Sequence, residues 1–211
     1  MYRAAPGGTP VRMVRWQPRS KGCPCITIPE KPFSDLAVAY SQSRKNGKER
    51  GGKISHKAVK SKEGKEEVHV TRVHNKKGGG GKADIVLPQT YPVAWHSHPS
   101  GCLDAPRACY LVPPSADDVE QFVRDAEAEG EFHIVTTEPG MYIVRVGALR
   151  DLDDGGEALA ARVRREENAV SKKIQACAEG CSKRGELHKD YVLHWDELMN
   201  KGGCPTYFIP W

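Results

Sequence analysis

Residues 93–99 read Val-Ala-Trp-His-Ser-His-Pro, an apolar run that leads straight into two histidines and a proline. An apolar run this short is typical of a strand buried inside a sheet. Side chains two positions apart on a strand point to the same face, so His96 and His98 are expected to lie side by side. Two imidazoles and one carboxylate, with a fourth position left for water, make up the ligand set of hydrolytic zinc sites. The stretch therefore predicts a buried strand that presents two metal ligands.

A carboxylate that could complete this ligand set occurs in residues 113–118, Pro-Pro-Ser-Ala-Asp-Asp. The proline pair breaks the preceding segment, and Ser115 is a typical residue at the start of a helix. A serine followed three residues later by an acid is also a common capping arrangement, which needs no metal. A His-x-His pair alone is equally ambiguous, because a single buried histidine is more often structural than a ligand. The joint occurrence of the two motifs favours a metal site.

These motifs resemble the pattern of the JAMM (MPN-plus, or JAB) zinc metallopeptidases, in which a Glu precedes His-x-His-Pro and Ser-x-x-Asp. The match covers residues 96–99 and 115–118. The resemblance implies that His96, His98 and Asp118 are zinc ligands.

The same resemblance leaves Asp117 out of register with the family's aspartate. Upstream, residues 49–54 (Glu-Arg-Gly-Gly-Lys-Ile) look like the family's glutamate and glycine pair at the start of a strand. They follow a predicted short helix, as in the JAMM-like domains of bacterial toxin proteins. The resemblance extends over about residues 34–146.

The resemblance implies an α/β (α+β) fold, with a cytidine-deaminase-like mixed sheet flanked by helices. For activity it implies amide hydrolysis, because zinc lowers the pKa of a bound water to about 7. Glu49 is the candidate base that takes the proton and returns it to the leaving amine. Ser115 is the candidate hydrogen-bond donor to the developing oxyanion. The expected substrate is a protein or peptide, with a ubiquitin-like isopeptide (a deubiquitinase-like reaction) as one candidate.

One interval departs from the family pattern. His98 and Ser115 are separated by 16 residues, more than is usual in the family. A loop insertion costs little free energy, so the ends of the strand and helix can stay in place. Because the inserted residues lie at the mouth of the expected site, we interpret the segment 99–114 as a lid or specificity loop. Obstruction of the metal, or Cys102 or Cys109 as an additional ligand, is the alternative.

At 211 residues, the chain can hold one sizeable domain with extensions. We expect an irregular N-terminal arm (1–32), an α/β domain (33–150) and a helical C-terminal extension (151–211). The expected helices are 34–43, a segment from Ser115 to Gly130, a segment from Glu157 and a short last helix at 191–198. The expected strands are 54–59, 68–73, 84–87, 93–96, 132–136, 141–146 and 207–209.

The net charge of +5 is concentrated in residues 44–82, which hold 13 Lys or Arg and 4 Glu. We interpret these lysines as protection of hairpin edges, and few aromatics interleave with them, so nucleic-acid binding is not expected. The seven cysteines include no pair of CxxC knuckles, which favours reduced thiols in a cytoplasmic setting over disulfides. No apolar run is long enough to span a membrane, and no secretory signal is visible. Signal-independent secretion stays open, as does the oligomeric state.

Three other functions remain as alternatives. The chain could be an inactive MPN-type scaffold, a secreted effector or toxin protease, or, as a distant choice, a nucleic-acid binder. The His-x-Glu and Pro-Cys-x-x-Cys of zinc deaminases and the HExxH helix of many zinc proteases are absent from the sequence. His133, His188 and His194 stand alone in the sequence, and we interpret each as structural.

Overall fold

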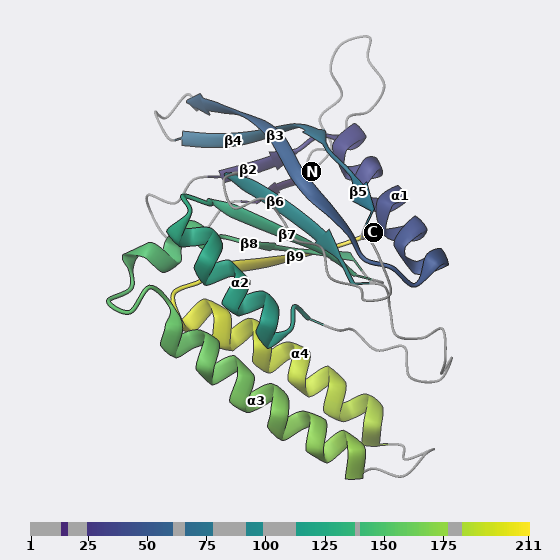
Figure 1. The fold of residues 1–211 in the computed structure, drawn as a ribbon, viewed down its shortest axis with the longest axis vertical. Coiled ribbons are helices and arrows are strands. Elements are labelled where there is room, and N and C mark those ends of the chain that lie inside the picture. Colours follow the sequence, from purple (N-terminus) through teal and green to yellow (C-terminus); the bar gives the residue numbers. More distant parts are fainter. Residues whose placement is uncertain are drawn as a thin grey trace.

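The computed structural model describes residues 14–16, 25–60, 66–77, 92–98, 113–137, 140–176 and 183–211 (Figure 1). In chain order the elements are β1 (Val14–Trp16), β2 (Cys25–Ile28), α1 (Glu30–Asn46), β3 (Arg50–Lys60), β4 (Glu66–Val73), β5 (Lys76–Lys77), β6 (Val93–Ser97), α2 (Ala116–Glu127), β7 (Phe132–Thr137), β8 (Gly140–Val144), the 3₁₀ helix η2 (Val146–Asp151), α3 (Glu157–Ala176), α4 (Lys183–Lys201) and β9 (Thr206–Pro210).

All the strands belong to one curled sheet in the order β1-β2-β4-β3-β6-β7-β8-β9, and β5 pairs with β3. The pairs β2–β4 and β6–β7 are parallel and the other neighbours are antiparallel. Parallel neighbours need a crossover connection, and α2 supplies it between β6 and β7. The expected mixed α/β architecture, a mixed sheet flanked by helices, is therefore confirmed at this level.

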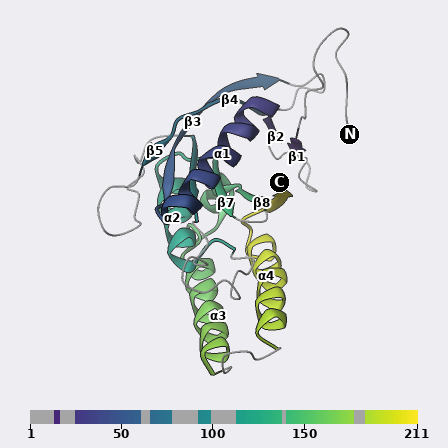
Figure 2. The ribbon, with the colours of Figure 1, turned by 90° about the vertical axis from the view of Figure 1, so that its right-hand side faces the viewer.

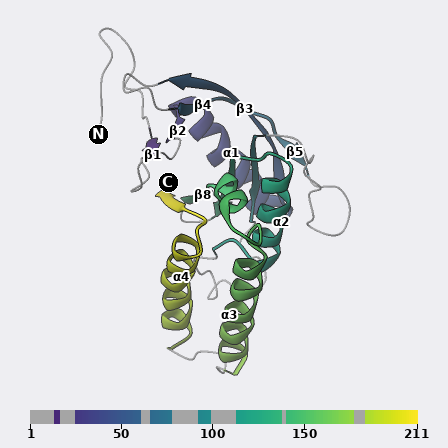
Figure 3. The same ribbon diagram turned by 90° about the vertical axis from the view of Figure 1, so that its left-hand side faces the viewer.

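Helices cover both faces of the sheet. Side chains alternate along β7, so Phe132 and Ile134 join the core under α1, whereas Val135 joins the core under α2, α3 and α4. Figures 2 and 3 show α1 beside the sheet and the long pair α3 and α4 projecting beyond it on the α2 side. The face that carries Val135 also carries His96, because these two residues are paired in the parallel register.

The N-terminal part of the chain is more ordered than the expected irregular arm. β2, with the sequence Cys-Ile-Thr-Ile, is a strand parallel to β4, and its Ile26 and Ile28 are fully buried. α1 begins at Glu30 rather than Ser34, and Pro29 is its N-cap. Its end agrees with the Asn-Gly turn signal, because Gly47 adopts φ 60°, a left-handed conformation that suits glycine.

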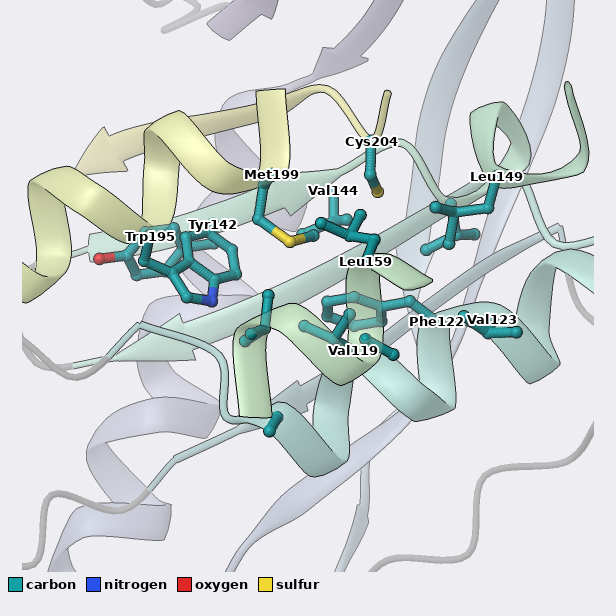
Figure 4. Close-up of a cluster of buried hydrophobic side chains, with 14 of the residues drawn as sticks. Val119, Phe122, Val123, Tyr142, Val144, Leu149, Leu159, Trp195, Met199 and Cys204 are labelled. Carbon is teal, nitrogen blue, oxygen red and sulfur yellow. The ribbon is translucent and has the colours of Figure 1, made fainter. Parts of the chain in front are cut away.

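The C-terminal segment shares the sheet and the core of the preceding residues. β9 pairs with β8, and Trp195 of α4 packs in an edge-to-face arrangement on Tyr142 of β8, with ring centroids 5.4 Å apart (Figure 4). α4 is 19 residues long, so the expectation of a short helix at 191–198 was wrong. The described residues beyond 150 therefore pack into the same core as α2 and β8.

Some expectations fall outside the described residues. They include the strand at 84–87 and the segment 99–112 with Cys102 and Cys109. None of the helices in the described ranges is both long enough and apolar enough to cross a lipid bilayer.

Candidate metal centre

His96 lies near the end of β6, a strand whose five residues are all buried between β3 and β7, and His98 directly follows the strand. Because the two histidines are two residues apart on an extended chain, their rings lie on the same face. Their Nε2 atoms are 2.9 Å apart, and the ring centroids are 4.9 Å apart. The sequence prediction that the two side chains lie side by side agrees with this geometry.

Asp118 reaches the same point from the first turn of α2. The helix starts with a capping box, in which Ser115 Oγ accepts a hydrogen bond from the Asp118 amide at 3.2 Å and the Ser115 amide donates one to Asp118 Oδ2 at 2.5 Å. The Ser115 hydroxyl also donates to Asp118 Oδ2, at 2.7 Å. The carboxylate oxygens lie 2.9 Å from His96 Nε2 and 3.0 Å from His98 Nε2. The Ser115 hydroxyl, expected to donate to an oxyanion, therefore donates to a ligand carboxylate in this structure.

The three side chains fit a metal ion by the chemistry of their atoms. Each offers one ligand atom, these atoms all lie within 4.8 Å of one another, and within the described ranges this is the one such group of His, Cys, Asp or Glu side chains that could hold a metal. Zinc ligands at about 2.0–2.1 Å in a tetrahedron lie about 3.3 Å from one another, close to the separations here. Lone pairs at this distance repel unless a proton or a cation lies between them, so the group can hold a metal ion.

Burial and charge together set the ionisation of these ligands. Burial lowers the pKa of His96 to about 4, although the Asp118 carboxylate favours the charged ring. Burial opposes ionisation of Asp118, but the charges and hydrogen bonds of His96 and His98 hold its pKa well below the ordinary value. A neutral imidazole and an ionised carboxylate are the forms that bind metals, so these two ligands need lose no proton at neutral pH.

His98 behaves differently because more carboxylates surround it. Burial favours its neutral form, but the hydrogen bond and charge of Asp118, together with the charges of Glu49 and Glu167, raise its pKa above the ordinary value. A cation at this point would be attracted by the same negative charges. Binding of a metal there is expected to displace a proton from His98.

Glu49, the candidate base, lies at the entrance to β3. Gly51 pairs with His96 in an antiparallel register, and the charge of Glu49, two residues before Gly51, acts on His98 and raises its pKa. The strands are still in contact at this end, because the Arg50 amide donates to Ser97 Oγ at 2.8 Å. Residues two apart on an extended chain share a face, so Glu49 is expected on the same face as Gly51 and His96.

Glu167 of α3 was not foreseen as part of the site. Its Oε2 accepts a hydrogen bond at 2.8 Å from the backbone amide of Ala116, at the first turn of α2. Its charge contributes to the raised pKa of His98. The sequence offered no local signal, because Glu167 lies 51 residues beyond Ala116 in a run of charged residues that is typical of an exposed helix.

The interpretation of His133 as an isolated structural residue was wrong in one respect. His133 is fully buried on β7, and its Nε2 is 2.7 Å from Nδ1 of His96. Its Nδ1 in turn is 2.7 Å from Oδ2 of Asp125 on α2. The sequence gives no signal for these contacts, because His96 lies 37 residues before His133 on another strand and Asp125 lies on the preceding helix. His194 lies 3.7 Å from Glu166, away from these contacts.

Comparison with models of protein families, with curated proteins and with solved structures finds no match to this chain. The chemistry of the site is therefore inferred from its geometry and from the motifs in the sequence.

Proposed function

We propose that the chain is a zinc-dependent hydrolase of the JAMM type that cleaves an amide bond in a protein or peptide. The observation that carries the proposal is the convergence of His96, His98 and Asp118, with the charge of Glu49 acting on His98. This is the ligand set of a hydrolytic zinc site with a carboxylate at its edge. The resemblance of residues 96–99 and 115–118 to the JAMM motif supports the same choice.

Each residue of the site has a task in this reaction. His96, His98 and Asp118 would hold the zinc, which supplies Lewis-acid activation of a water molecule near neutral pH. Glu49 would accept a proton from that water and deliver it to the leaving amine. Ser115 would stabilise the oxyanion once its hydroxyl is no longer bound to Asp118. The hydroxyl therefore has two competing acceptors.

The zinc content of the purified full-length chain tests the first half of the proposal. We expect one zinc per chain in the wild type and almost none in His96→Ala, measured by elemental analysis after dialysis. Glu30→Gln is a suitable control, because Glu30 is exposed at the start of α1. A wild-type chain that neither retains nor takes up zinc would contradict the proposal.

Hydrolysis of tagged peptides and of ubiquitin-like conjugates tests the second half. We expect Glu49→Gln to bind zinc as the wild type does but to lose at least 100-fold in rate, since general acid–base catalysis contributes about 10²–10⁴-fold. A chelator should abolish the activity of the wild type, and added zinc should restore it. Zinc binding without Glu49-dependent hydrolysis would instead identify an inactive scaffold of the same fold.

A further inference from the structure

We propose that Asp125 and His133 are positioning residues for the metal ligand His96, which they hold in the ring orientation and tautomer that a metal requires. The inference rests on the metal centre of the proposed function, but it is independent of the substrate. It assigns a task to a buried histidine and its half-buried carboxylate partner, which the capping of α2 does not need.

The three side chains form a continuous line of hydrogen bonds leading away from the metal centre. His96 Nε2 faces Asp118, while His96 Nδ1 is 2.7 Å from His133 Nε2. His133 Nδ1 is 2.7 Å from Asp125 Oδ2. Asp118 and Asp125 are seven residues apart on α2, two helical turns, and so share one face. The helix α2 therefore supplies the ligand Asp118 and also Asp125, which is the last residue in the series of hydrogen bonds that starts at the ligand His96.

The positions of the protons follow from the acceptors at the two ends. A histidine that gives the Nε2 lone pair to a metal carries its proton on Nδ1. That proton is donated to His133 Nε2, so the proton of a neutral His133 lies on Nδ1 and is donated to the Asp125 carboxylate. Every contact in the line then joins one donor to one acceptor.

The other tautomer of His96 is penalised by the same line. With the proton on Nε2, His96 Nδ1 becomes an acceptor, and His133 must turn its own proton toward it. A neutral His133 would then face the Asp125 carboxylate with a lone pair, which places two acceptors 2.7 Å apart. An ionised Asp125 therefore favours the tautomer of His96 that can bind a metal.

Two further contacts keep Asp125 and His133 in this state. Burial opposes ionisation of Asp125, but the hydrogen bonds from His133 and Gln121 lower its pKa. Gln121 Nε2 donates to Asp125 Oδ1 at 2.7 Å. The buried ring of Phe122 packs against His133 with centroids 4.9 Å apart, which restricts rotation of the imidazole.

Partners behind metal-bound histidines commonly change metal affinity by about 10–100-fold when they are mutated. We therefore expect Asp125→Asn to raise the zinc dissociation constant by about 10–100-fold, measured on the full chain by competition with a chromophoric chelator. The control is Glu127→Gln, an exposed carboxylate on the same helix, which should leave the constant unchanged. If Asp125→Asn and Glu127→Gln give the same constant, the inference is overturned.

A double-mutant comparison separates positioning from a general effect of charge. Asp125 acts through His133 in this scheme, so Asp125→Asn should have no further effect on zinc affinity in a His133→Phe background. An equal effect in both backgrounds would mean that Asp125 acts directly on the metal, and would contradict the inference.

The ring-nitrogen NMR shifts of the wild-type chain loaded with zinc need no variant at all. We expect both His96 and His133 to be protonated at Nδ1, whereas protonation of His133 at Nε2 would overturn the inference. The proposed function can fail separately. Zinc binding with this pattern but without hydrolysis would support the positioning role and contradict the hydrolase, whereas a wild type without zinc binding would overturn both.

Discussion

Asp117 and Asp118 are adjacent carboxylates in the first turn of α2, yet only Asp118 faces the histidines. Asp117 is 83% exposed and forms an ion pair with Arg164 of α3, whereas Asp118 is 15% exposed between His96 and His98. Residues one apart on a helix point about 100° away from each other, which explains the separation. The first turn of α2 thus carries two neighbouring carboxylates, one directed toward the histidines and one directed toward solvent and Arg164.

This pair gives a matched test of the metal ligand. We expect Asp118→Asn to weaken zinc binding at least 100-fold, because it replaces an anionic ligand in a set of three. Asp117→Asn should leave the zinc dissociation constant within about twofold, since exposed ion pairs contribute little. Chelator competition on the two purified variants measures both constants, and equal losses would contradict the assignment of Asp118.

The same residue predicts a dependence of stability on pH in the metal-free protein. His96 and His98 lower the pKa of the Asp118 carboxyl in the folded state despite its burial. A depressed carboxyl pKa adds stability above the unfolded value of about 3.9, and this stability is lost as the pH falls through the folded value. We expect the urea midpoints of wild type and Asp118→Asn to differ most near pH 5, where Asp118 is ionised and His98 is protonated, and to converge as the pH falls below about 4. A constant difference would contradict the coupling.

At this scale the sequence predicted what is local. His96, His98 and Asp118 belong to short motifs, and the spacing within each motif indicates the end of a strand or the start of a helix. His133 could not be predicted, because its relation to His96 depends on which strands are neighbours. The β6–β7 pairing brings Val135 beside His96, and His133 lies two residues earlier on the same face.

At the scale of elements, α2 is the part of the molecule on which the site depends most. Its N-terminus is held to β6 by Asp118 and to α3 by Glu167, which accepts from the Ala116 amide. A second link to α3 runs from Arg164 to Glu120 at 2.6 Å. The helical C-terminal segment therefore contributes charge and support at the first turn of α2, where a ligand is placed.

Glu167→Gln tests this contribution of α3. The amide oxygen of glutamine can still accept from Ala116, but the negative charge near His98 is removed. We expect zinc affinity to fall about two- to fivefold at low salt and less at high salt, as for a partly exposed charge. Glu166→Gln is the matched control, because Glu166 lies near His194 instead. An effect of Glu166→Gln as large as that of Glu167→Gln would indicate a general charge effect.

The elements that sequence patterns missed share a physical cause. β2 is only four residues long, and a Cys-Ile-Thr-Ile run gains its burial from α1 and β4 rather than from any period of its own. α4 begins well before the apolar positions Tyr191 and Trp195 that revealed its second half. Both were underestimated because tertiary packing, not local propensity, stabilises them.

At the scale of the whole molecule, the question is whether α3, α4 and β9 form an accessory layer or part of one cooperative unit. The cluster in Figure 4 joins Phe122 of α2, Tyr142 of β8, Leu159 of α3 and Trp195 of α4 around one core. β9 extends the sheet by pairing with β8 along five residues. Removal of this segment would expose apolar surface directly behind the helix that carries Asp118, which favours a single cooperative unit.

Trp195→Ala tests this view, because Trp195 is fully buried on α4 and far along the chain from the metal ligands. Truncation of a buried tryptophan costs about 3–5 kcal/mol, and in a chain of this size each kcal/mol lowers Tm by about 2–4 °C. We expect one unfolding transition, shifted downward as a whole, in calorimetry of the metal-free chain. Leu193→Ala is the control, since Leu193 is 64% exposed and should change stability by about 0.5 kcal/mol or less.

In a cooperative unit, zinc stabilises every part that unfolds with the site, so saturating zinc should raise Tm in wild type and Trp195→Ala alike. Two transitions, of which only the upper one responds to zinc, would show instead that the C-terminal helices unfold independently of the metal centre.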